Sequence, residues 1–118
     1  MKQCIVVEDD PFWAAEIRRM LEGEAVEVFC ASTGLKALEL AAAHPAAAII
    51  LDIILPDIDG LKVLESLQPS SRPVLAVTGG GRMGADFYLR LARQFGARGE
   101  LAKPFTDQQL LESWRSLH

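Results

Sequence analysis

The sequence predicts a doubly wound α/β fold, in which helices cover both faces of a five-stranded parallel sheet. Short apolar runs alternate five times with segments of helical periodicity along the 118 residues. Strands and helices that alternate in this way form parallel sheets, and right-handed crossovers place helices on both faces of such a sheet. A chain of this length buries one hydrophobic core, so we expect a single domain over residues 1–118.

The five predicted strands are short apolar runs between turn-forming or helix-starting residues. They cover residues 4–7, 25–31, 46–51, 73–77 and 98–102. The third run, AAAIIL, is followed directly by an aspartate and a Pro/Asp/Gly turn, and the fourth, PVLAV, precedes a glycine-rich stretch. Continuous apolar runs of this length are typical of strands that are buried on both faces.

The five predicted helices follow the strands in turn. They cover residues 11–24, 32–44, 59–68, 85–97 and 106–117. Pro11 suits the first position of its helix, and Asp10 and Asp59 are expected to act as helix caps. The residues expected to face the core are Trp13, Ile17, Met20 and Leu21 in the first helix, Leu35, Leu38 and Ala42 in the second, and Leu110, Leu111 and Trp114 in the last.

Charge and composition exclude several classes of protein. The 12 basic and 16 acidic residues give a net charge of −4, which argues against a nucleic-acid-binding face. No apolar run approaches the roughly 18 residues of a membrane helix, and the N-terminus does not read as a signal peptide. Cys4 and Cys30 both lie in strand-like runs, so we expect buried, reduced thiols in a cytoplasmic protein.

Residues able to do chemistry follow four of the five predicted strands. They are Glu8, Asp9 and Asp10 after the first strand, Asp52 after the third, Thr78 after the fourth and Lys103 after the fifth. The carboxyl ends of parallel strands meet at one edge of the sheet, where ligands bind in folds of this kind. We therefore expect carboxylates, a hydroxyl and an ammonium group to converge there.

Carboxylates that crowd together repel one another unless a positive charge lies among them. Ligation by oxygen alone suits Mg²⁺, and no Cys or His lies near these strand ends to favour zinc. Beside a metal ion, Asp52 could attack phosphorus while Lys103 and Thr78 contact the phosphoryl oxygens. The alternative is a structural salt-bridge cluster, because such networks also gather carboxylates round a lysine.

These residues resemble the response-regulator receiver domain of two-component and phosphorelay signalling, over the whole chain. The motif IVVEDDP is similar to the family's first-strand acidic motif, and LDIILPDIDGLKVL is similar to its phosphoacceptor motif. AKPF is similar to the lysine motif, with a cis peptide bond expected before Pro104. The resemblance implies a flavodoxin-like sheet with strand order 2-1-3-4-5.

The resemblance also implies a role for each site residue. Asp52 would be the phosphoacceptor, Thr78 the switch hydroxyl and Lys103 the phosphate-contacting lysine. The implied ligands of Mg²⁺ are Glu8, Asp9, Asp52 and the backbone carbonyl of Ile54. Such a domain would take a phosphoryl group from a histidine kinase or phosphotransfer protein, then relay it or switch the binding of an unknown downstream protein. It would not be an enzyme beyond self-phosphorylation and slow autodephosphorylation.

Three features depart from the family pattern. One is that we expect no output domain, because the sequence ends with the fifth predicted helix. Glu100 replaces the aromatic residue that is common three positions before the lysine, and the segment between the switch hydroxyl and the lysine is longer than usual. Because a carboxylate resists moving toward an anionic phosphoryl site, we expect Glu100 to stay on the outer face near Arg90 and Arg93. We expect the switch signal to pass instead through the loop 79–84. That loop begins with Gly79, Gly80 and Gly81.

Two other functions fit parts of the same pattern. A pseudo-receiver would bind partners without being phosphorylated, but the acidic residues, the hydroxyl and the lysine are all present. An aspartate-nucleophile phosphohydrolase would need a second Asp, two residues after the nucleophile, as general acid, and this position is Ile54. The phosphorylated receiver domain is therefore the favoured function.

Overall fold

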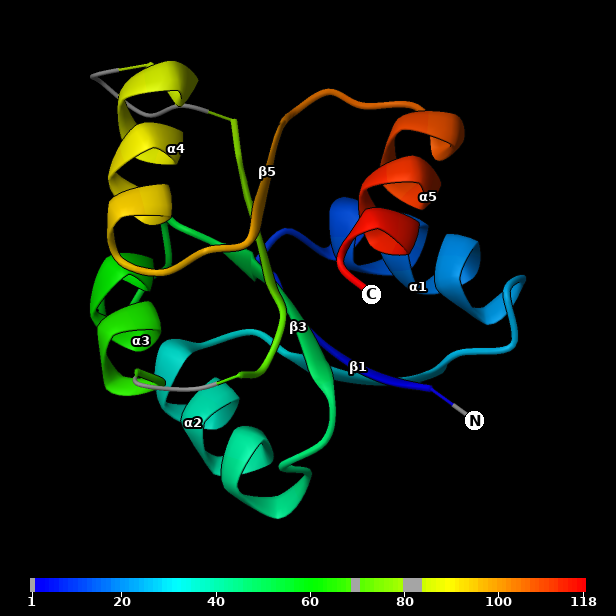
Figure 1. Cartoon of the computed structure of the whole chain (residues 1–118), viewed down its shortest axis with the longest axis horizontal. Coiled ribbons are helices and arrows are strands. Elements are labelled where there is room, and N and C mark those ends of the chain that lie inside the picture. The colour runs from blue at the N-terminus through cyan, green and yellow to red at the C-terminus, as the bar shows by residue number, and fades with distance from the viewer. Residues whose placement is uncertain (1, 69–70, 80–83) are drawn as a thin grey trace.

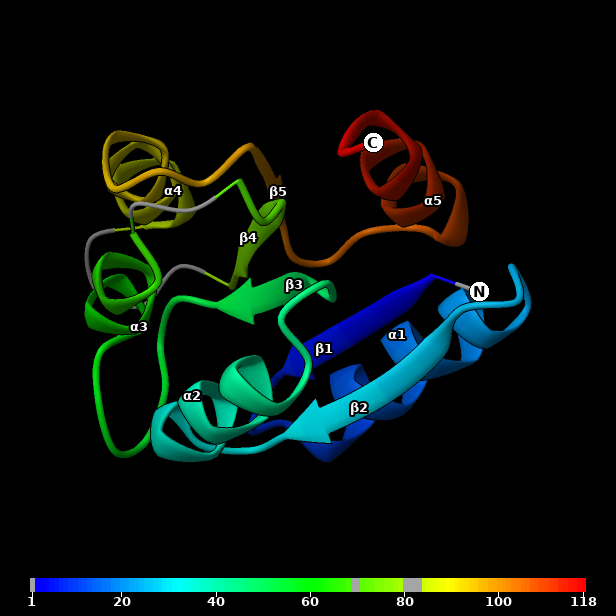
Figure 2. The ribbon, with the colours of Figure 1, turned by 60° about the horizontal axis from the view of Figure 1, so that its bottom comes forward.

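Five parallel strands form one sheet in the computed structural model of the chain, which describes residues 2–68, 71–79 and 84–118. The strands are β1 (Gln3–Val7), β2 (Glu27–Ala31), β3 (Ala48–Asp52), β4 (Val74–Thr78) and β5 (Gly99–Ala102). Their order across the sheet is β2-β1-β3-β4-β5, so the predicted fold class and strand order are confirmed. Figure 2 shows the arrows of β2 and β3 pointing the same way on either side of β1.

Helices cover both faces of the sheet, as predicted (Figure 1). The helices among the described residues are α1 (Pro11–Glu22), α2 (Gly34–Ala43), α3 (Gly60–Ser66), α4 (Ala85–Gln94) and α5 (Asp107–Ser116). α1 and α5 lie on one face, and α2, α3 and α4 lie on the other. Pro11 is the first residue of α1, and the Asp10 side chain accepts a hydrogen bond from the N–H of Phe12 at 2.9 Å, so the predicted cap is confirmed.

The sheet separates two apolar clusters, because alternate residues of a strand point to opposite faces. The cluster beside α2, α3 and α4 includes Ile5, Val7, Ile49, Leu51, Val63 and Leu89. The cluster beside α1 and α5 includes Val6, Ile17, Ile50, Val77, Leu110 and Trp114. The central strands β1, β3 and β4 contribute to both clusters, which explains why their sequences are almost continuously apolar.

The prediction for the core face of α2 holds for Leu38, which is partly buried against the core, but is wrong for Leu35 and Ala42, which are exposed. The predicted stripe was Leu35, Leu38 and Ala42, whereas the buried residues are Gly34, Ala37 and Ala41. Leu35 is 64% exposed. The smallest side chains face inward because α2 packs closely: a Cβ added at Gly34 would lie 2.3 Å from Cγ1 of Ile58. Periodicity alone gives weight to large apolar residues, but close packing selects residues that fit the available space.

The prediction of two buried cysteines holds only for Cys4. Cys4 is buried in β1, but Cys30 is exposed on β2. β2 is an edge strand with a neighbour on one side only, and Cys30 lies beside Arg18, whose guanidinium donates to Sγ at 3.9 Å. A strand-like sequence therefore does not by itself ensure that a side chain is buried.

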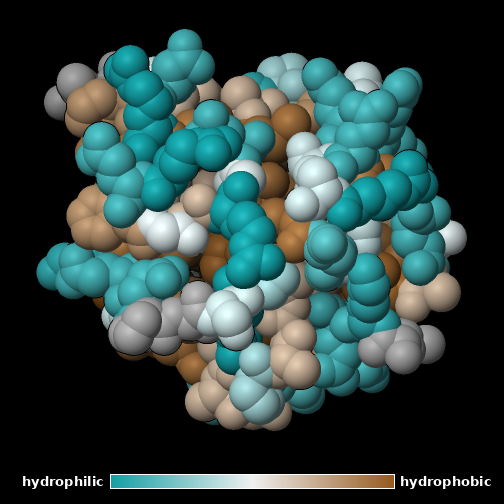
Figure 3. Space-filling model, in the orientation of Figure 1, coloured by the Kyte–Doolittle hydropathy of each residue, from teal (hydrophilic) through white to brown (hydrophobic). Residues whose placement is uncertain are grey.

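One face of the domain is largely polar. Hydrophilic residues cover most of the face shown in Figure 3, with hydrophobic atoms visible between them. On the surface of α1 and α5, Arg19 pairs with Glu16 and Asp107 at 3.1 Å, although exposed pairs of this kind add little to stability. Each helix in the described part of the chain is too short or too polar to cross a lipid bilayer.

Gly60 is the first residue of α3 and lies close to the backbone at the end of β3. A Cβ at Gly60 would lie 2.5 Å from Cα of Ile53 and 2.6 Å from the carbonyl oxygen of Asp52, and these backbone atoms have little freedom to move. We expect Gly60→Ala to lower the free energy of unfolding by about 1–3 kcal/mol, the usual range for overpacking. Urea denaturation measures this change.

Gly79→Ala is the matched control, since a Cβ at Gly79 would meet no atom within 4 Å. We expect this substitution to change the free energy of unfolding by no more than about 0.5 kcal/mol. Equal stabilities of the two variants would contradict the close approach at Gly60.

Candidate functional site

An acidic hollow of about 340 Å³ opens at the carboxyl edge of the sheet, where β1, β3, β4 and β5 end. It is lined by Glu8, Asp9, Asp10, Asp52, Ile54, Thr78, Gly79 and Lys103. These residues come together because parallel strands all end on the same edge of the sheet. The structure thus brings the carboxylates, the hydroxyl and the lysine of the strand ends into one place.

Glu8 is held at both of its carboxylate oxygens directly after β1. Its Oε2 accepts a hydrogen bond from the N–H of Asp10 at 3.1 Å, and its Oε1 accepts one from Nζ of Lys103. Burial raises the pKa of Glu8 to about 7; the neighbouring Asp52 adds to this rise, whereas the hydrogen bond from Lys103 opposes it. A further positive charge beside Glu8 would therefore favour its ionised form.

The ammonium group of Lys103 links two buried carboxylates. Its Nζ donates to Oε1 of Glu8 and, at 3.0 Å, to Oδ2 of Asp52. Burial acts to lower the pKa of Lys103, but the hydrogen bonds to Glu8 and Asp52, together with the negative charges of these carboxylates, raise it above its ordinary value. The backbone N–H of Lys103 donates to the carbonyl of Thr78 at 2.9 Å, so the residue is also anchored to the end of β4.

Asp52 is the last residue of β3, and its carboxylate lies at the floor of the hollow. Its Oδ1 accepts a hydrogen bond from the N–H of Ile54 at 2.9 Å, while Oδ2 accepts one from Lys103. Thr78 ends the neighbouring strand β4, where it is fully buried and lines the same hollow. The two oxygens of Asp52 are thus oriented by one backbone donor and one ammonium group.

Glu8, Asp9 and Asp52 form an acidic cluster that could hold a metal ion. Each residue offers one carboxylate oxygen, and the three oxygens lie within 4.8 Å of one another. An all-oxygen donor set of this kind suits a hard cation such as Mg²⁺ or Ca²⁺. Ile54, whose carbonyl is the predicted fourth ligand, lines the same hollow.

Two further aspartates shape the loop that follows β3. Asp59 accepts from a backbone N–H in the first turn of α3 at 2.8 Å, so its predicted role as a cap is confirmed. Asp57 accepts from the N–H groups of Gly34 and Leu35, at 2.7 and 3.0 Å, and thereby ties the loop to the start of α2. The role of Asp57 could not be predicted from the sequence, because no local motif marks a cap whose donors are 23 and 22 residues away.

Among the described residues predicted for the switch, Thr78 and Gly79 line the hollow, whereas Arg90, Arg93 and Glu100 do not. Glu100 of β5 is exposed on the outer face and pairs with Arg93 of α4, with 3.4 Å between Oε2 and Nε. Arg90 is exposed on the same helix. Gly80 and Gly81 lie outside the described residues, so the proposed passage of the signal through loop 79–84 stays a prediction.

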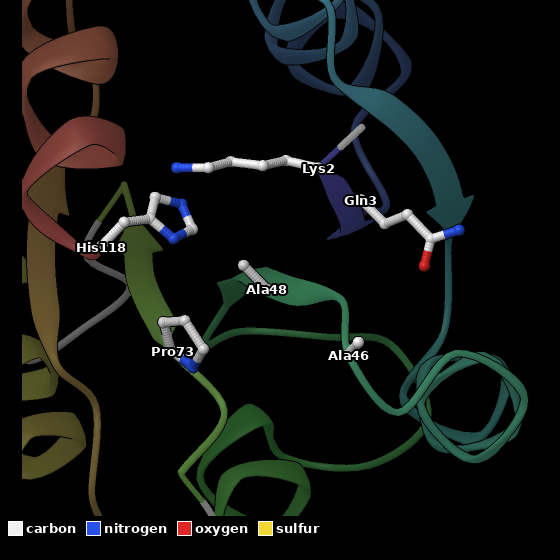
Figure 4. Close-up of a pocket in the computed structure, with 6 residues that line it drawn as sticks. All are labelled: Lys2, Gln3, Ala46, Ala48, Pro73 and His118. Atoms are coloured by element: carbon white, nitrogen blue, oxygen red, sulfur yellow. The ribbon is translucent and has the colours of Figure 1, made fainter.

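A second hollow, of about 360 Å³, lies at the opposite edge of the sheet, where β1 and β3 begin (Figure 4). It is lined by Lys2, Gln3, Ala46, Ala48, Pro73 and His118. Lys2 extends across it toward His118, but none of the described residues that line it is a carboxylate. We therefore place the functional site at the carboxyl edge, where opposite charges converge, although the two hollows are similar in size.

Comparisons with known proteins show the family of the chain. The response regulator receiver domain family matches residues 4–115. The polar-differentiation response regulator DivK of Brucella ovis is 30% identical to the chain over 119 residues, which cover 98% of this chain and 94% of DivK. The chain therefore belongs to the response regulator receiver domain family.

Solved structures of receiver domains have the same fold. The BeF₃-activated N-terminal receiver domain of Klebsiella pneumoniae RstA matches with a TM-score of 0.87 and 26% identity, over 98% of this chain and 97% of that chain. A CheY-like receiver domain protein from Methanospirillum hungatei matches with a TM-score of 0.81 and 27% identity, over 98% and 92% of the two chains. Fold and family together identify a domain of two-component signalling.

The cap made by Asp57 predicts a pH dependence of stability. Hydrogen bonds from the N–H groups of Gly34 and Leu35 hold the pKa of Asp57 below its ordinary value. A carboxyl group with a lowered pKa stabilises the fold above its unfolded-state pKa, and this contribution is lost as the pH falls through the folded-state pKa. We expect Asp57→Ala to melt at a lower temperature than wild type at pH 7, with a smaller difference at about pH 2.5. A difference that is the same at both pH values would contradict this account.

Proposed function

We propose that this receiver domain accepts a phosphoryl group on Asp52, from a histidine kinase or a histidine phosphotransfer protein. The setting of the Asp52 carboxylate supports this most: it is 5% exposed, lies in an open hollow, contacts Lys103 and borders the acidic cluster. Charged groups held in this way in a cleft are typical of functional sites. The phosphorylated domain then passes the group on or changes its binding to a downstream protein.

In the proposed transfer, an oxygen of Asp52 attacks phosphorus in line with the nitrogen of the donor imidazole. A P–O bond forms as the P–N bond breaks, and the electron pair of the broken bond stays on the histidine nitrogen. Lys103 and Thr78 offer an ammonium group and a hydroxyl to the phosphoryl oxygens at the same edge of the sheet. The N–H of Ile54 orients the attacking carboxylate through its hydrogen bond to Oδ1.

The proposed metal is Mg²⁺, held by Glu8, Asp9, Asp52 and the carbonyl of Ile54. The carboxylates fit such an ion because they supply oxygen ligands that lie within 4.8 Å of one another. Bound there, Mg²⁺ would supply positive charge against the oxygens of the transferring group. The chain's own contribution is to keep three carboxylates close together despite their mutual repulsion.

The surface round the hollow supports a protein as the phosphodonor. In the described part of the chain, the large apolar side chains that stay exposed are Phe12, Leu35 and Ile54. They lie at the start of α1, at the start of α2 and in the loop after β3, all at the carboxyl edge of the sheet. Apolar side chains that are exposed at the edge that holds a polar site are available for contact with another protein. A protein donor would bury them while its phosphohistidine reaches Asp52.

The two other functions account for less of the site. A pseudo-receiver would have no use for a buried lysine held between Glu8 and Asp52 beside an acidic cluster. A phosphohydrolase would need a general acid two residues after its nucleophile, where Ile54 has an apolar side chain that is 41% exposed. We infer no enzymatic activity beyond self-phosphorylation and slow loss of the acyl phosphate.

Asp52→Asn is expected to abolish phosphorylation, because an amide oxygen is a poor nucleophile and forms no stable acyl phosphate. Wild type and variant are incubated with Mg²⁺ and labelled phosphohistidine donors, and separately with acetyl phosphate, and the label per chain is measured. We expect label on the wild type and background levels on the variant.

Asp107→Asn is the control for that experiment, since Asp107 is an exposed carboxylate on α5 that pairs with Arg19. It is expected to be labelled like the wild type. Equal label on Asp52→Asn would overturn the assignment of the phosphoacceptor. A wild type that no donor labels would instead favour the pseudo-receiver.

Mg²⁺ is expected to stabilise the fold without any phosphate, because a cation that binds only the native state stabilises it by mass action. At about ten times its dissociation constant, this amounts to about 1.4 kcal/mol. Thermal melts should therefore shift upward in millimolar Mg²⁺ but not in NaCl of the same ionic strength.

Asp9→Ala is expected to remove the Mg²⁺-dependent shift, since Asp9 supplies one of the three carboxylate oxygens of the cluster. Asp107→Ala, which removes an exposed carboxylate elsewhere, should keep the shift. A wild-type melting temperature that Mg²⁺ leaves unchanged would count against the metal site.

A further inference from the structure

The aromatic ring of Trp13 lies against the ammonium group of Lys103. Nζ of Lys103 is 5.8 Å from the centroid of the Trp13 ring, which is within the range of a cation–π contact. The same ammonium group donates to Glu8 and Asp52, and the Lys103 side chain is 10% exposed. Two carboxylates and one indole face therefore form the immediate surroundings of this charge.

The position of Trp13 is set by contacts on two sides. Its ring centroid lies 4.6 Å from that of Phe105, which is buried two residues after Lys103. The start of α1 is tied to the site as well, because the N–H of Asp10 donates to Oε2 of Glu8 and Asp10 caps the helix. The indole is thus fixed relative to the residues on both sides of the hollow.

We infer that Trp13 is a positioning residue for Lys103, an inference that rests on the proposed function. Glu8 belongs both to the pair with Lys103 and to the cluster that could hold a metal ion. A cation bound by Glu8 competes with the ammonium group for the same carboxylate, and a lysine side chain that loses a partner gains rotational freedom. The indole face is uncharged and offers no oxygen ligand, so a metal ion does not compete for it. It therefore keeps the ammonium group beside Asp52.

The contact itself can be tested without metal or phosphate. Protons near an aromatic face resonate upfield, so the ε-methylene protons of Lys103 should show an upfield NMR shift in the wild type. The shift should be reduced in Trp13→Phe, which keeps a smaller aromatic face, and lost in Trp13→Leu. A wild-type Lys103 with the ordinary shifts of an exposed lysine would overturn the inference, whether or not Trp13→Leu folds.

The consequence for the site can be tested with beryllofluoride, a mimic of the phosphoryl group, in the presence of Mg²⁺. We expect Trp13→Leu to bind it about three- to tenfold more weakly than wild type, in keeping with the strength of a partly desolvated cation–π contact. Trp13→Phe should stay close to wild type. Phe29→Leu, which removes a partly buried aromatic ring from β2, is the control and should bind like wild type.

The outcomes separate a positioning role from simple packing. Equal losses in Trp13→Phe and Trp13→Leu, or no loss in a folded Trp13→Leu, would overturn the inference, because only the aromatic face should matter. A wild type that shows the upfield shift but binds no beryllofluoride would refute the proposed function and, with it, the role given to Trp13. A wild type that binds beryllofluoride without the upfield shift would refute the role of Trp13 alone.

Discussion

The arrangement of the strand ends depends on the contacts of the Lys103 ammonium group with two carboxylates. Glu8 follows β1, and Asp52 is the last residue of the adjacent strand β3. Both are buried, so their charges repel each other and each has lost hydration. Lys103 follows the edge strand β5 and offsets this repulsion by donating to both carboxylates. One positive charge against two buried negative charges leaves the hollow electronegative. This excess of negative charge opposes folding, and it also attracts cations to the site.

Much of the fold could be predicted from the sequence, because its main signal is local. The alternation of apolar runs with helical segments can be seen directly in the sequence, and it predicts a parallel sheet. The chemistry at the strand ends could be predicted for the same reason. Asp52, Thr78 and Lys103 each stand at or directly after a strand, and the topology of the sheet places them at one edge.

Other features could not be predicted, because they depend on distances across the chain. In α2 the buried residues are Gly34 and its small neighbours, since the helix lies close to Ile58 in a loop that follows a different strand. Asp57 reads as an ordinary turn residue, yet its partners are the first N–H groups of α2. The contact between Trp13 and Lys103 joins the first helix to the residue that follows the last strand, and no pattern of spacing in the sequence indicates it.

The sheet also divides the interior into two apolar clusters, one beside α1 and α5 and the other beside α2, α3 and α4. Side chains without shared partners contribute to stability almost independently of each other. Each helical layer can therefore change during evolution without forcing compensating changes in the other layer. One layer can change its packing while the other continues to support the sheet. The strand ends that hold Glu8, Asp52 and Lys103 would then keep their arrangement while either layer changes.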